Sequence, residues 1–283
     1  MEKILFTTSY TNHSREAFRY AQQLAYHFGA SITVAHIYLP LSSVNMNDFE
    51  LEESENGQYC GEFADDLEWQ EKFLQLQAFV KDLAIEQFED IEIDCILTEG
   101  EVVNQLLEIQ QMNRFDLVIM GMRRHNRLGR LFGNTTYEMI HQMDCPLLLI
   151  PPDTYFMGIE KMMYTTAFEL EEQGTISWLL EWCSAFDAQL EIIHVTRNEK
   201  HGSAMRNLVT MLRSFEKEKD AGTIHFQILD GTVADLVKNY ISKQEIDLLI
   251  VHHRKKGIWQ RLEEERLTKS LSEDLKMPLL VLK

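Results

Sequence analysis

The chain has 283 residues, of which 45% are hydrophobic, and it can therefore bury one large core or two smaller ones. Its formal net charge of -18 opposes nonspecific binding to nucleic acid or anionic lipid, so we expect neither as a partner. The four cysteines lie far apart without a Cys-x-x-Cys pair, which argues against a zinc knuckle or a disulfide framework. No apolar run approaches the roughly 20 residues of a membrane span, and we expect a soluble, cytoplasmic protein.

Strands and helices alternate along the first half of the chain. The patterns predict strands at 4–8, 31–37, 91–97, 117–120 and 147–150, and helices at 14–28 and 102–112, with further helices between the remaining strands. Because the strands are almost continuously apolar, we expect a parallel sheet with helices on both faces. In such a doubly wound sheet a ligand binds at the carboxyl ends of the strands, where the winding reverses.

An acidic segment interrupts this pattern at about residues 41–75. Its carboxylates crowd one stretch that begins at Asp48: Glu50, Glu52, Glu53, Glu55, Glu62, Asp65, Asp66, Glu68 and Glu71. A solvated loop and helix start is the simpler interpretation. A partner-binding acidic face is the alternative.

The second half repeats the first. Residues 1–38 align without a gap with residues 159–196, at an offset of 158, so that MEKILFTTSY lies over IEKMMYTTAF and His36 over His194. We interpret these two histidines as structural hydrogen-bonding residues. Later the offset is 131, where FDLVIMG pairs with IDLLIVH, and the difference of 27 residues corresponds to the acidic segment.

The repeat predicts two tandem domains, residues 1–152 and 159–283, each with a five-stranded, open, doubly wound parallel sheet. Strands are expected in the second domain at 162–166, 189–195, 224–229, 248–251 and 279–282, with helices at 173–186 and 233–243. The last strands of the two domains read LLLI and LLVL, and they offer matching apolar edges. We therefore expect them to pair and to form an intramolecular pseudo-dimer.

A basic loop follows the fourth strand, GMRRHNRLGRLFGNTT, from Gly121 to Thr136. A glycine-bearing loop that leads into a helix N-terminus can cradle a phosphate with backbone N–H groups. A basic surface turn with a helix cap explains the same residues equally well. The corresponding second-domain loop loses these glycines and places Glu263, Glu264 and Glu265 before its helix, so we expect no nucleotide there.

Both domains resemble the universal stress protein (UspA-like) domain, which belongs to the adenine nucleotide α-hydrolase-like, flavodoxin-like folds. The block KILFTTSYTNHSREAFRYAQQLAYHFGASITVAHIY resembles the opening strand, helix and second strand of that family. The basic loop resembles its nucleotide signature, G-x2-G-x9-G-(S/T). Gly121 matches the first glycine, Arg124 replaces the second, and Gly133 comes one residue early, with Asn134 in the hydroxyl position and Thr135 after it.

The resemblance implies a degenerate site for ATP or AMP in the first domain. Members that bind ATP carry an aspartate after the first strand, but Ser9 stands there in the first domain and Ala167 in the second. The backbone that contacts adenine maps to Ile37. The site residues that the resemblance implies are Thr8, Ser9, Ile37, Gly121, Arg123, Arg124, Gly133, Asn134 and Thr135.

The function expected on these grounds is that of a stress-response regulator, and the alternative is a nucleotide-free binding or scaffold protein with the same fold. We expect no enzyme, because the aspartate position that could supply a general base is vacant. We also expect no metal: His252 and His253 are adjacent, so their side chains point in different directions. Protein partners and a further homodimer stay open.

Overall fold

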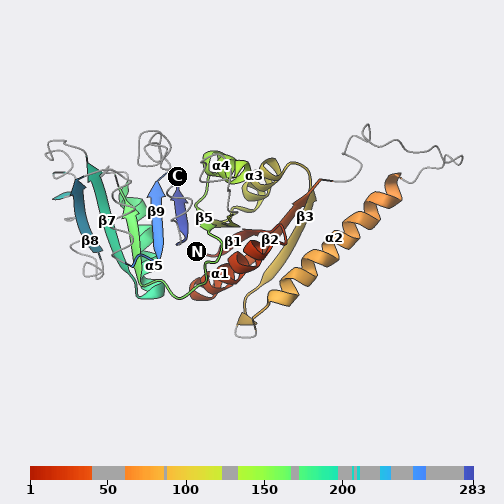
Figure 1. The fold of residues 1–283 in the computed structure, drawn as a ribbon, viewed down its shortest axis with the longest axis horizontal. Helices are drawn as coiled ribbons and strands as arrows, with labels where there is room; N and C mark the ends of the chain where they lie inside the picture. Colours follow the sequence, from red (N-terminus) through yellow and green to blue (C-terminus); the bar gives the residue numbers. More distant parts are fainter. Residues whose placement is uncertain are drawn as a thin grey trace, which may run out of the picture.

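The computed structural model describes residues 1–39, 61–85, 88–122, 133–166, 172–196, 206, 209–210, 224–230, 245–252 and 277–283. Three expected features lie outside these ranges: the part of the acidic segment that precedes residue 61, the basic loop at 123–132 and the helix expected at 233–243. The described strands form one ten-stranded sheet in the order β3-β2-β1-β4-β5-β10-β9-β6-β7-β8 (Figure 1). The described helices include none with the length and apolar character that crossing a membrane requires.

The N-terminal half, residues 1–152, contributes one end of the sheet. Its elements are β1 (Lys3–Thr7), α1 (Asn12–Phe28), β2 (Ser31–Tyr38), α2 (Gly61–Leu83), β3 (Ile93–Glu99), α3 (Val102–Asn113), β4 (Leu117–Gly121), α4 (Asn134–Gln142) and β5 (Leu147–Ile150). All neighbouring strands in this half are parallel. The chain winds from β1 outward to β2 and β3, and then returns to the other side of β1 for β4 and β5.

The C-terminal half, residues 159–283, repeats this strand order. Its described elements are β6 (Lys161–Thr165), α5 (Gln173–Phe186), β7 (Gln189–Thr196), β8 (Ile224–Asp230), β9 (Leu248–His252) and β10 (Leu279–Leu282). The halves meet where β10 runs antiparallel to β5, with Leu280 opposite Leu148. The expected fold class and edge pairing are thus confirmed, and the two sheets are joined into one. The domain limits at residues 152 and 159 stay a prediction.

The two halves share equivalent hydrogen bonds. Asp116 precedes β4, and its carboxylate accepts the backbone N–H groups of Glu2 (2.6 Å) and Lys3 (3.0 Å). Asp247, 131 residues later, accepts those of Glu160 and Lys161, both at 2.9 Å. Each carboxylate therefore ties the start of one strand to its neighbour.

The matched histidines also have the same role. Nδ1 of His36 lies 2.9 Å from the carbonyl oxygen of Thr8, and Nδ1 of His194 lies 2.9 Å from that of Thr166. Because a carbonyl oxygen can only accept, Nδ1 carries the hydrogen in both rings. The prediction that these histidines are structural hydrogen-bonding residues is confirmed.

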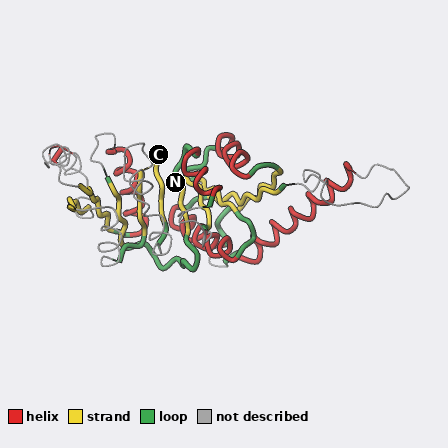
Figure 2. The backbone as a smooth tube through the Cα atoms, turned by 45° about the horizontal axis from the view of Figure 1, so that its top comes forward, coloured by secondary structure: helices red, strands yellow, loops and turns green. Residues whose placement is uncertain are grey.

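Two apolar layers cover the sheet and run through both halves. One contains buried residues of α1, α2 and α5, and the other contains those of α3 and α4. Helices lie on either side of the strands (Figure 2). At the junction α1 contacts α5, where the Phe28 ring lies 5.6 Å from that of its equivalent, Phe186, and 5.1 Å from that of Trp182. Since both layers cross the junction, the two halves bury their apolar surface together.

Candidate functional site

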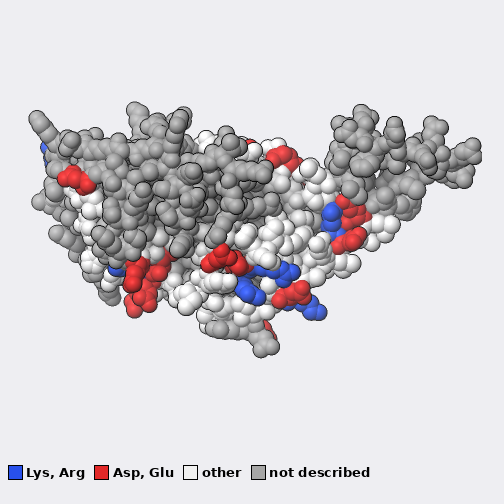
Figure 3. All heavy atoms as spheres, in the orientation of Figure 1, with Lys and Arg blue, Asp and Glu red and all other residues white. Residues whose placement is uncertain are grey.

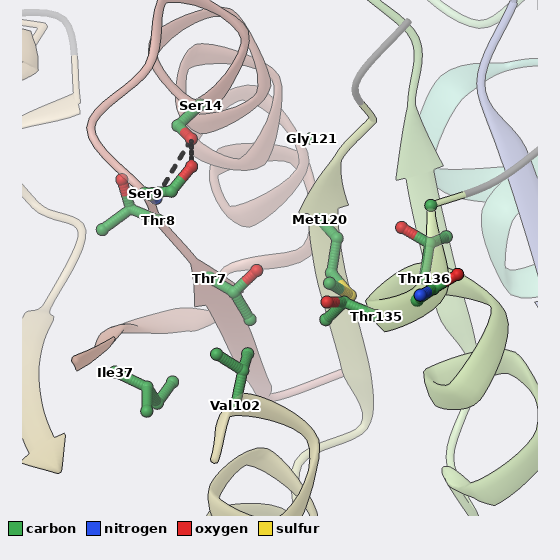
Figure 4. Close-up of a pocket in the computed structure, with 12 residues that line it drawn as sticks. Thr7, Thr8, Ser9, Ser14, Ile37, Val102, Met120, Gly121, Thr135 and Thr136 are labelled. Atoms are coloured by element: carbon green, nitrogen blue, oxygen red, sulfur yellow. Dashed lines mark hydrogen bonds between the residues drawn. The ribbon is translucent and has the colours of Figure 1, made fainter. Parts of the chain in front are cut away.

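A cavity of about 350 Å³ opens at the carboxyl ends of β1 and β4, where the winding of the N-terminal half reverses (Figure 4). Ligand sites are typically cavities of about 300–1,000 Å³, so this one is at the small end of the usual range. It is lined by Thr7, Thr8, Ser9, Ser14, Ile37, Val102, Met120, Gly121, Gly133, Asn134, Thr135 and Thr136. Hydroxyl groups thus make up much of its polar wall.

The loop between β1 and α1 forms one wall of the cavity. Thr11 caps α1, and its hydroxyl accepts the N–H of Ser14. The Ser14 hydroxyl in turn accepts the N–H of Ser9 (3.2 Å) and lies 3.4 Å from the Ser9 hydroxyl. Next to Ser9, Tyr10 has φ +58°, and its N–H donates to the Thr8 hydroxyl (3.1 Å). These bonds hold the loop in a conformation that non-glycine residues seldom adopt.

The first turn of α4 forms the opposite wall. Gly133 is the N-cap residue and offers no side chain to the helix, so no side-chain cap bond is made there. Thr135 and Thr136 follow within the first turn and line the cavity. The N-terminal N–H groups and the positive end of the helix dipole favour an anion at this position.

Gly121, at the end of β4, has a steric reason to lack a side chain. A Cβ atom there would lie 3.0 Å from the carbonyl oxygen of His13 and 3.4 Å from the Cβ of Ala17. The first turns of α1 therefore pack directly against the end of β4. This close packing explains the glycine without any phosphate.

His36 supports the cavity wall from behind. Burial lowers the pKa of His36, the hydrogen bond to Thr8 partly opposes that effect, and the positive charge of Lys72 adds to it. The ring of Tyr10 lies 4.2 Å from that of His36, centroid to centroid. A neutral His36 therefore fixes the Thr8 carbonyl and, through Tyr10, the strained loop.

Seven of the nine residues predicted for the site line the cavity; Arg123 and Arg124 lie outside the described residues. The prediction did not include Thr7, Ser14, Val102, Met120 or Thr136. Met120 ends a predicted strand, Thr7 is the last residue but one of another, and Ser14 and Val102 begin predicted helices. A rule that takes every residue at the carboxyl edge would have included them.

The equivalent positions of the C-terminal half carry different side chains. The offsets place Thr166, Glu172 and His252 at the positions of Thr8, Ser14 and Gly121. Glu172 is 1% exposed, and its carboxylate accepts the hydroxyl of Thr166. His252 is 8% exposed, its Nδ1 has no hydrogen-bond partner in the described residues, and burial lowers its pKa. Among the residues that the structure describes, no three His, Cys, Asp or Glu side chains group as they would around a metal.

Comparison with solved structures gives the same architecture over the whole chain. A universal stress protein from Archaeoglobus fulgidus DSM 4304 has a TM-score of 0.73 at 13% identity, covering 99% of this chain and 98% of that one. A putative universal stress protein from Pseudomonas aeruginosa UCBPP-PA14 has a TM-score of 0.65 at 14% identity, covering 100% and 93%. At such identities the likeness concerns the fold alone.

Comparison by sequence identifies the family of this chain. No curated protein matches the chain. A model described as the universal stress protein family matches residues 1–151, which is the half that contains the cavity. The chain belongs to the universal stress protein family.

Proposed function

We propose that this chain is a regulatory protein of the universal stress type that binds an adenine nucleotide, ATP or AMP, in its N-terminal half and none in its C-terminal half. One observation carries the proposal. The cavity at the ends of β1 and β4 combines the uncapped first turn of α4 with a wall of hydroxyl groups. This combination suits phosphate oxygens on one side and a sugar on the other.

The arrangement of the lining residues supports a particular orientation of the ligand. The phosphates would lie at the N-terminus of α4, near Gly133 and Thr135. The base would lie between the apolar side chains of Ile37 and Val102, on the other side of the space that Figure 4 shows. Ser9 would contact the sugar. A serine hydroxyl offers one short donor where a carboxylate would accept two hydrogen bonds, so the affinity should be modest.

We expect binding without hydrolysis. The described residues that line the cavity contain hydroxyl, amide and apolar side chains but neither a carboxylate nor a histidine. Such groups can position a nucleotide, but they do not supply a general base at neutral pH.

The C-terminal half is unsuited to the same ligand. Glu172 stands at the position of Ser14 and is almost fully buried. Its longer side chain, bonded to the Thr166 hydroxyl, would take up the space that the short Ser14 side chain leaves open in the N-terminal cavity. One nucleotide per chain is therefore expected.

The test is calorimetric titration of the purified protein with ATP and with AMP. Ser9→Asp, which introduces the carboxylate of the ATP-binding relatives, should tighten binding by about tenfold, the effect of a charge-assisted hydrogen bond. Ser31→Asp is the matched control, because Ser31 is the first residue of β2 and lies at the amino ends of the strands, whereas the cavity lies at their carboxyl ends. Its affinity should equal that of the unmodified chain.

Two outcomes would contradict the proposal. No heat at millimolar nucleotide, for both the unmodified chain and Ser9→Asp, would favour the nucleotide-free scaffold protein. A stoichiometry of two nucleotides per chain would show that Glu172 does not close the C-terminal half.

A further inference from the structure

Tyr10 has a backbone conformation that is unfavourable for tyrosine. Its φ of +58° lies in the left-handed region, and the residue stands between Ser9, which lines the cavity, and Thr11, which caps α1. Glycine would adopt this φ freely, whereas another residue stays there only where its surroundings compensate for the strain. The contacts of Tyr10 must therefore provide that compensation.

The Tyr10 ring lies next to both strand β2 and helix α2. Its centroid is 4.2 Å from that of the His36 ring on β2 and 5.6 Å from that of the Phe79 ring on α2. Its hydroxyl is buried and has no hydrogen-bond partner among the described residues; burial raises the pKa of Tyr10, and the nearby Cys95 raises it further. Packing thus holds the ring, and α2 supplies part of that packing.

Helix α2 also lies next to His36. The Lys72 ammonium is 5.0 Å from the centre of the Tyr38 ring on β2, and it is 3.5 Å from the carboxylate of Glu68 on its own helix. Figure 3 shows acidic and basic side chains side by side over α2. Burial lowers the pKa of His36, and the charge of Lys72 lowers it further, so the neutral ring donates its Nδ1–H to the carbonyl oxygen of Thr8. Both supports of this cavity wall therefore lie next to α2.

Helix α2 packs on the sheet through its C-terminal part. There Leu76, Phe79 and Leu83 are 0–3% exposed, whereas Leu67 and Leu74 are 67% and 65% exposed. The N-terminal part of the helix runs past β3 and away from the rest of the molecule (Figures 1 and 2). Elements with few buried contacts open more readily than the core of a protein. A change in the packing of α2 thus reaches the cavity wall through Phe79.

We propose that α2 regulates the nucleotide site of the N-terminal half through the Tyr10 ring. While α2 is packed on the sheet, Phe79 and His36 hold this ring, and the loop at residues 8–11 keeps the conformation that lines the cavity. When α2 shifts, the strain at Tyr10 is no longer compensated, and the affinity falls with the fraction of chains that keep this conformation. Tyr10 is thus a positioning residue, which acts on the ligand through its neighbours in the loop. The identity of the ligand rests on the proposed function, but the coupling of α2 to the loop does not.

Two measurements on the full chain separate this coupling from ligand binding. The first is the affinity for ATP and for AMP by calorimetric titration. The second, without ligand, is hydrogen exchange by mass spectrometry in a peptide that spans the loop. The variants are Tyr10→Ala, Tyr10→Phe, Phe79→Leu and the combination of Tyr10→Ala with Phe79→Leu. Leu83→Ala is the matched control, because Leu83 is also on α2 and also 3% exposed but ends the helix at the amino ends of the strands, away from the loop.

Tyr10→Ala should weaken nucleotide affinity and speed exchange in the loop, each by at least about fivefold, and Phe79→Leu, which leaves the His36 contact in place, by at least about threefold. Tyr10→Phe keeps the ring and loses only a hydroxyl without a partner in the described part of the chain, so it should restore both values to within about twofold. The combined variant should equal Tyr10→Ala, because Phe79 acts through the Tyr10 ring. Leu83→Ala should change neither value by more than about twofold. All variants are compared at a temperature at which circular dichroism shows them to be folded.

Unchanged exchange in the loop of Tyr10→Ala or Phe79→Leu would overturn the proposal, whether or not a nucleotide binds. So would equal nucleotide affinities of Tyr10→Ala and the unmodified chain. An effect of Leu83→Ala as large as that of Phe79→Leu would also overturn it, since the loop would then respond to stability alone. If the unmodified chain binds neither nucleotide while exchange changes as expected, the proposed function is wrong and the coupling of α2 to the loop stands.

Discussion

Replacement of Gly121 by alanine tests whether close packing or ligand binding requires this glycine. The added Cβ would meet the His13 carbonyl oxygen at 3.0 Å and the Ala17 methyl at 3.4 Å. Because the first of these atoms is backbone, α1 must shift by a few tenths of an ångström. Overpacking of this kind costs about 1–3 kcal/mol. At about 2–4 °C per kcal/mol for a protein of this size, Gly121→Ala should lower the Tm by several degrees without any ligand present.

Gly174→Ala is the control, because it should change the stability in the opposite direction. Gly174 lies in the first turn of α5, and a Cβ there would meet no atom within 4 Å. Gly174→Ala should therefore stabilise the chain by up to about 1 kcal/mol, through helix propensity and reduced freedom of the unfolded chain. Both variants are compared by thermal melting followed by circular dichroism. An unchanged Tm for Gly121→Ala would refute the steric argument and leave ligand binding as the reason for the glycine.

Three further predictions concern the hydrogen bonds and buried groups. Asp116→Ala and Asp247→Ala each remove two bonds from a strand start, and each should lower the free energy of unfolding by about 1–2 kcal/mol in urea titrations; unequal losses would contradict their equivalence. Burial lowers the pKa of His36 and His252 below 6.5, so the folded chain binds fewer protons than the unfolded chain. Stability should be constant above about pH 6.5 and fall below it, and replacing both by glutamine should weaken that dependence. Burial raises the pKa of Cys145 to about 12, so iodoacetamide at pH 8 should label it, by mass spectrometry, only after unfolding.

The sequence pattern predicted most elements because each strand is apolar enough to identify by itself. The first and last residues of a strand were harder to predict, because pairing with the neighbouring strand determines them. Strand β3 was expected at 91–97 but runs from Ile93 to Glu99, because its register with β2 pairs Ile32 with Ile93 and Tyr38 with Glu99. Ile91 packs on the core from the preceding turn instead. Hydrophobicity marks burial, but only the neighbouring strand decides which buried residues pair.

The site was predictable where position along the chain determines position in space. Ser9 and Gly121 follow parallel strands, so the topology alone brings them to one edge of the sheet. Position along the chain did not identify Ser14 as a site residue, because its role depends on the hydrogen bonds that its hydroxyl group makes with Ser9 and Thr11. The steric reason for Gly121 was likewise invisible, because it involves the carbonyl oxygen of a residue 108 positions earlier, His13.

Among the described residues, the two halves keep equivalent hydrogen bonds within the sheet and carry different side chains at the strand ends. Asp116 and Asp247 make the same bonds, and so do the matched histidines, because losing either set would loosen a strand that the whole sheet shares. The C-terminal half also covers the edge of β5 and completes the apolar layers around Trp182. These contacts constrain the backbone of the C-terminal half, but they do not constrain the side chains at the ends of its strands. A buried carboxylate at Glu172 is therefore tolerated at the strand ends where the N-terminal half has an open cavity, and under the proposed function the C-terminal half needs to keep only the packing on which the N-terminal half depends.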